Sequence, residues 1–123
     1  ATYVTTAGDT TLTLGGGISD AEIANTGTQA SSDKGGFNVG LSAVTGDITL
    51  AIGITSGEAK DSDTLGTAGT TDDSTDSTSA SVTYAVASGV SAVLGYTTVD
   101  TNNEGQSTTD GGSAWYVGAT MSF

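Results

Sequence analysis

Residues 113–123 have the sequence Ser-Ala-Trp-Tyr-Val-Gly-Ala-Thr-Met-Ser-Phe, and this stretch decides the fold. From Trp115 onward every second residue is apolar, and the residues between them are small or polar without charge. A repeat of two with one apolar face is typical of a β-strand whose two sides meet different surroundings. The apolar set is Trp115, Val117, Ala119, Met121 and Phe123. The stretch therefore predicts a β-strand over residues 113–123 with one apolar and one polar face.

The same alternation recurs along the chain in pairs of segments that flank short turn sequences. The most regular pair flanks Gly46-Asp47, a dipeptide suited to a two-residue hairpin turn. Such a turn pairs Leu41 with Ile52, and only this register places both apolar sets on one face. We therefore predict seven strands, over residues 2–7, 10–19, 35–45, 48–56, 79–86, 90–98 and 113–123.

Two further turns follow the same logic. A turn at residues 8–9 pairs Tyr3 with Leu14, so that both side chains share one face. A turn at residues 87–89 requires Gly89 in the left-handed region. The remaining connections have no period, are rich in polar residues, and are predicted to be long loops over residues 20–34, 58–78 and 100–112.

Composition excludes several classes of function. The chain has 123 residues, with 14 acidic and 2 basic ones and a net charge of -12, which argues against nucleic acid as a partner. It has no Cys, His or Pro, which excludes disulfides, zinc-thiolate sites and histidine-based catalysis. We therefore predict no enzymatic activity, and no catalytic, cofactor-binding or metal-binding residue.

The placement of charge favours a membrane setting for the apolar faces. Every acidic or basic residue falls in a predicted turn or loop, whereas the polar strand faces carry Thr, Ser, Gly, Ala and Asn. No run of 18 apolar residues is present, which excludes a transmembrane helix, but a barrel strand needs only about 9–11 residues. Tight turns alternating with long loops are typical of outer-membrane barrels. The alternative is a secreted or cell-surface all-β adhesin or structural module, whose apolar faces pack on one another.

The segment Ala114 to Phe123, together with the Gly-Asp hairpins before it, resembles the C-terminal portion of a general diffusion porin of the alphaproteobacterial type. In that family a terminal strand ending in Phe is read by the insertion machinery. The resemblance implies an antiparallel transmembrane β-barrel of sixteen strands, forming a water-filled channel for passive diffusion of small hydrophilic solutes and ions. Because seven is an odd number of strands, we expect residues 1–123 to be the C-terminal portion of a single barrel domain.

The resemblance also implies a multi-pass protein of the Gram-negative outer membrane, assembled as a homotrimer and surrounded by the lipid bilayer and lipopolysaccharide. Phe37, Tyr96 and Trp115 fall at the long-loop ends of their strands, and Phe123 falls at the other end, where aromatic girdles of barrels lie. The acidic residues of the long loops would enrich cations near the channel mouth.

Two sets of polar residues are candidates for contact with solutes or ions. The polar strand faces would line the channel through Thr11, Thr13, Asn38, Ser42, Thr49, Thr55, Thr83, Ser91, Thr97, Tyr116 and Thr120. No cofactor is expected. The acids that could bind Ca²⁺ are Asp61, Asp63, Asp72, Asp73 and Asp76, but they lack EF-hand spacing and an acidic solvated loop is the favoured interpretation.

Overall fold

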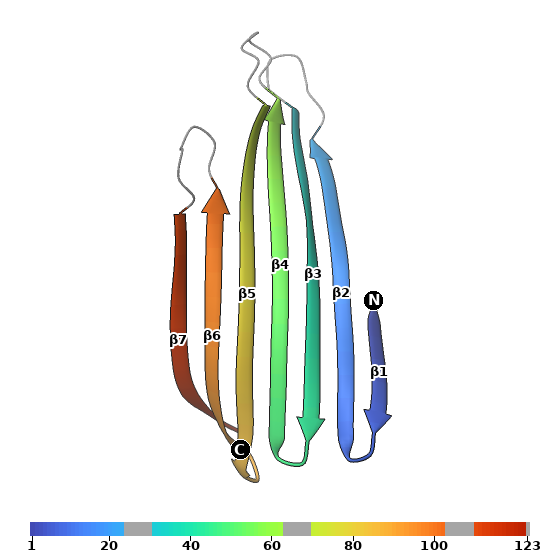
Figure 1. Cartoon of the computed structure of the whole chain (residues 1–123), viewed down its shortest axis with the longest axis vertical. Helices are drawn as coiled ribbons and strands as arrows, with labels where there is room; N and C mark the ends of the chain where they lie inside the picture. Colours follow the sequence, from blue (N-terminus) through green and yellow to red (C-terminus); the bar gives the residue numbers. More distant parts are fainter. Residues whose placement is uncertain (24–30, 63–69, 103–109, 123) are drawn as a thin grey trace.

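The computed structural model describes residues 1–23, 31–62, 70–102 and 110–122. The described residues form one antiparallel sheet of seven strands, each paired with its neighbours in the sequence, and Figure 1 shows β1 and β7 at its two edges. The predicted all-β antiparallel architecture is confirmed. The strands are β1 (Thr2–Ala7), β2 (Thr10–Ile23), β3 (Ser31–Thr45), β4 (Ile48–Ser62), β5 (Thr70–Ala87), β6 (Val90–Asn102) and β7 (Asp110–Met121).

Tight turns join the strands at one end of the sheet (Figure 1). Gly8 and Gly46 occupy the first position of their two-residue turns with φ angles of 61° and 55°, which a type II′ hairpin turn requires. The turns set the predicted registers: Tyr3 faces Leu14 across β1 and β2, and β3 pairs with β4 as expected. Turn chemistry and apolar pattern therefore agree.

The third hairpin turn has an irregularity beside it. Gly89 has a φ of 74°, as predicted. Ala85 faces Ser91 and Ala87 faces Val90, so one extra residue of β5 lies between these two pairs. This bulge keeps the apolar positions of β5 and β6 on the same side of the sheet.

The strands extend further from the tight turns than predicted. The stretches 20–34, 58–78 and 100–112 were expected to be loops, but each contributes to two strands. Seven residues separate the strands in each of these connections. The prediction was wrong because the extensions are mostly polar on both faces. No hydrophobic period marks them, although the backbone pairing continues.

The extensions also overturn the prediction that all charged residues lie in turns and loops. Physically, a strand tolerates charge on both faces wherever both faces meet water. The final strand likewise spans residues 110–121 rather than 113–123, and Phe123 lies outside the described residues. Charged residues on strands are Asp20, Glu22, Asp33, Lys34, Glu58, Lys60, Asp61, Asp72, Asp73, Asp76, Asp100 and Asp110.

The described part of the chain has no buried apolar side chain and therefore no hydrophobic core of its own. Leu50 is 50% exposed and Val117 is 81% exposed. Leu50, Leu94 and Val117 lie on one face of one sheet, and the described residues form no second sheet that packs on them. The described residues also contain no helix that is long and apolar enough to cross a membrane. Because exposed apolar surface is costly in water, this face requires a covering.

The opposite face has one close-packed feature. Tyr116 of β7 faces Gly95 of β6, and its ring lies where a side chain at Gly95 would begin. Gly95 is the one residue classed as buried in the part of the chain whose side chains are described. The ring therefore covers the backbone of β6 and holds the edge strand against it.

Substituting Gly95→Ala should lower the free energy of unfolding by about 1 to 3 kcal/mol, because the new Cβ would overlap the Tyr116 ring. Gly40→Ala is the matched control, since its Cβ would meet only the Ile52 carbonyl oxygen at 3.7 Å. Urea unfolding in detergent micelles measures the difference. Equal midpoints for the two variants would contradict the packing, and Tyr116→Ala should restore the stability of Gly95→Ala.

Candidate functional site

The apolar face is continuous across the sheet. Residues that face one another on successive strands form rows, and one row crosses all seven strands. Its members are Tyr3, Leu14, Leu41, Ile52, Ala80, Tyr96 and Trp115. The next row towards the tight turns consists of Thr5, Leu12, Ala43, Leu50, Val82, Leu94 and Val117. Two adjacent rows with one polar member form a surface suited to hydrocarbon.

Two aromatic residues mark the edge of this surface. The rings of Tyr96 and Trp115 have centroids 4.5 Å apart and are tilted by 43° to each other. On the apolar face, each is the apolar residue of its strand that lies furthest from the tight turns, as Phe37 is on β3. These three residues therefore occupy the positions expected for an aromatic girdle, and Phe123 lies outside the described residues.

The eleven predicted channel-lining residues all lie on the opposite, polar face. The pairing registers place them there together: Asn38 faces Thr55, Thr49 faces Thr83, and Ser91 faces Thr120. Four further hydroxyl residues of β5 lie on this face, namely Thr75, Ser77, Ser79 and Ser81. Thr75 and Ser77 fall in a stretch that was predicted to be a loop, whereas Ser79 and Ser81 lie within the predicted strand and were not included.

This polar face is nearly free of charge. Lys34, Asp73 and Asp110 lie on it close to the ends of their strands that point away from the tight turns. Between these residues and the tight turns, the described strands carry no charged residue on the polar face. Scattered valines interrupt it at Val4, Val44, Val93 and Val99. Hydroxyl and amide groups can hydrate this surface without trapping an ion.

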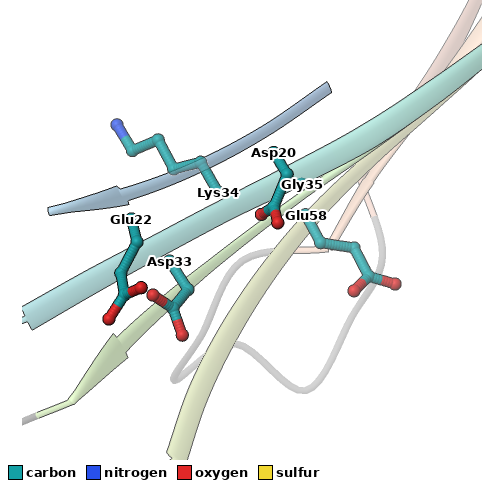
Figure 2. Close-up of a pocket in the computed structure, with 6 residues that line it drawn as sticks. All are labelled: Asp20, Glu22, Asp33, Lys34, Gly35 and Glu58. Carbon is teal, nitrogen blue, oxygen red and sulfur yellow. The ribbon is translucent and has the colours of Figure 1, made fainter. Parts of the chain in front are cut away.

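Acidic residues gather beyond the apolar rows, at the end of the sheet away from the tight turns. Figure 2 shows the carboxylates of Asp20, Glu22, Asp33 and Glu58 on one side of the sheet and the Lys34 ammonium on the other. Strand alternation explains the division, because Lys34 follows Asp33 directly. The residues border a groove of about 260 Å³.

Of the candidate calcium ligands, Asp73 and Asp76 have side chains in the described part of the chain. Asp73 and Asp76 are three residues apart on β5 and therefore point to opposite faces. Asp63 and the side chains of Asp61 and Asp72 lie outside the described part of the chain. Among the side chains that are described, no group of three or more acidic residues could hold a metal ion. The favoured interpretation, a solvated acidic loop, and the calcium-binding alternative both stay untested.

Comparison with known proteins identifies the fold. No protein-family profile matches the sequence, and no curated protein matches it. The chain is similar in structure to a solved protein described as "Outer-membrane expressed OmpT of Vibrio cholerae", with a TM-score of 0.68 and 20% sequence identity. The match covers 99% of this chain and 40% of that one, so the chain spans about two fifths of its neighbour's length. The seven-stranded sheet therefore has the fold of part of an outer-membrane β-barrel protein.

Proposed function

We propose that this chain forms part of the wall of an outer-membrane channel, through which small hydrophilic solutes and ions diffuse passively. The observation that carries the proposal is the one-sidedness of the sheet. One face is apolar and exposed, the other bears uncharged hydroxyl groups, and the described residues have no buried core between them. The chain would form a barrier whose polar face contacts water, and it would catalyse no reaction.

Hydrocarbon is a suitable covering for the apolar face because the sheet satisfies its own backbone. From β2 to β6 each strand pairs on both sides, and the ladder is continuous except at the bulge near Ala87. A bilayer offers no hydrogen bonds, so only such fully paired structures can cross it. The exposed apolar residues would then contact acyl chains instead of water.

The sheet would form part of a larger barrel. In the described residues β1 and β7 pair only with β2 and β6, and both run toward the tight-turn end (Figure 1). Closing an antiparallel barrel between two strands of the same direction requires a further strand between them. We therefore propose that these strands belong to a larger barrel, of the sixteen-stranded trimeric porin type, with lipid and lipopolysaccharide around it.

Planar-bilayer recording separates this function from the adhesin alternative. A channel protein should raise bilayer conductance in discrete ohmic steps and migrate as a heat-modifiable oligomer on gels. An adhesin would stay monomeric and soluble without detergent, and it would leave the bilayer silent. Silent bilayers with a detergent-free soluble monomer would therefore refute the channel.

A charge should be tolerated on the polar face only. Ile52→Lys places an ammonium on the apolar face, within the apolar segment Ile48–Ile54 of β4, and should cost about 2–4 kcal/mol of folding free energy in lipid vesicles. Ala51→Lys is the neighbouring control on the polar face and should change the free energy little. Urea titration in vesicles measures both. Equal losses for the two variants would contradict the assignment of the faces.

Lysine on the polar face should change ion selectivity. Thr55→Lys places a positive charge on the proposed channel wall. The reversal potential measured in a salt gradient should therefore shift in the direction of greater anion selectivity. Ser56→Lys is the matched control, because the adjacent residue of β4 points to the other side of the sheet. The channel assignment fails if Ser56→Lys shifts the potential as much as Thr55→Lys does.

A further inference from the structure

The apolar face has a constant length on every long strand. On each strand from β2 to β7, four successive positions of this face carry apolar residues, with one glycine among them. The bulge on β5 makes Ala87 the fourth position there, opposite Val90. The runs are Leu12–Ile18, Phe37–Ala43, Ile48–Ile54, Ala80–Ala87, Val90–Tyr96 and Trp115–Met121.

The ends of these runs do not fall in the same row on successive strands. On the side of the tight turns, the run of β2 ends at Leu12, which shares a row with Val117 of β7. The run of β7 ends at Met121, four residues beyond Val117. The boundary of the apolar surface therefore moves toward the tight turns from β2 to β7.

The opposite boundary moves in the same direction. Ile18 and Phe37 end the runs of β2 and β3, and they share a row with Asp76 of β5 and Asp100 of β6. These two acids face each other directly across the strands. Two like charges in direct opposition destabilise a sheet even in water, and their cost in hydrocarbon would be far higher. This single row is thus apolar on β2 and β3 and charged on β5 and β6.

The carboxylates follow this slanted boundary closely. On each strand from β2 to β6, an exposed acid lies four residues beyond the last apolar residue of the run, on the same face. These acids are Glu22, Asp33, Glu58, Asp76 and Asp100. They do not share a row, but they keep a constant distance from the apolar surface. Apolar and acidic residues therefore define the same slanted line independently.

At the tight-turn boundary a polar pair shows the same displacement. The hydroxyl groups of Thr10 and Thr45 are hydrogen-bonded at 2.7 Å, on the apolar side of the sheet just below the runs of β2 and β3. Ala92 and Ala119 lie in the same row on β6 and β7, within the apolar runs. From β2 to β7 this row changes from polar to apolar, in the opposite order to the row of Phe37 and Asp100.

Resting on the proposed membrane location, we propose that bilayer hydrocarbon covers an oblique belt made of these six runs. Four residues span about 13 Å along a strand and the five spacings from β2 to β7 cover about 24 Å, so the belt crosses the rows at about 29°. Barrel strands lean by a similar angle, about 35–45°, from the bilayer normal. The outer edge of the belt consists of Ile18, Phe37, Ile54, Ala80, Tyr96 and Trp115, with the acids above it in water.

Spin labels on β3 and β6 test the belt. The sequence has no cysteine, so single-cysteine variants need no background substitutions. Phe37→Cys and Asp100→Cys lie in one row, and Thr45→Cys and Ala92→Cys lie in another. All four native residues are exposed. The labelled protein is reconstituted in phosphatidylcholine vesicles, and collision with O₂, which concentrates in lipid, is compared with collision with the water-soluble complex NiEDDA.

We expect several-fold higher O₂ than NiEDDA collision at Phe37→Cys and Ala92→Cys, and the reverse at Asp100→Cys and Thr45→Cys. Equal ratios within each row would overturn the oblique belt while leaving the membrane location intact. Water-like ratios at all four positions would instead refute the membrane location. Shielding of Phe37→Cys or Ala92→Cys from both reagents would show protein rather than lipid as the covering. Unchanged β-sheet circular dichroism verifies that each variant folds.

Discussion

The continuous backbone ladder is the constraint on which the rest of this structure depends. Each strand pairs with its sequence neighbours, and at the hairpin ends the pairing is set by turns at Gly8, Gly46 and Gly89. Because register in a sheet has a period of two, these turns determine which side chains face outward. The three short turns therefore align the apolar faces within the pairs β1–β2, β3–β4 and β5–β6. This alignment needs no core, and none is present in the described residues.

The two faces of the sheet differ in how they restrain the chain. The apolar face presents large side chains that gain stability only when something covers them. The polar face is built of small residues, with Tyr116 laid across Gly95 as the main close contact at the edge. In the proposed barrel wall, the apolar residues would face outward and the polar face would contact water. This inverts the arrangement of a soluble β-sandwich, in which apolar faces meet in the middle.

Much of this could be predicted from the sequence, and the limits are instructive. The registers at Leu41–Ile52 and Tyr3–Leu14 were predicted because alternation and turn chemistry both specify them. The extents of the strands were not, because residues such as Thr75 and Ser77 are polar on both faces and show no hydrophobic period. The predicted channel-lining set lacked Thr75 and Ser77 for the same reason. The slant of the apolar surface depends on the relative stagger of all seven strands, which no single hairpin reveals.

The central claim is that the apolar face meets hydrocarbon, and the single tryptophan of the chain tests it without any substitution. Trp115 is 72% exposed on that face, at the outer edge of its run. The measurement is its fluorescence in vesicles containing phospholipids brominated on the acyl chain near the headgroup. The account predicts strong quenching by these lipids and weak quenching by aqueous iodide. Strong iodide quenching with no effect of the brominated lipids would contradict it.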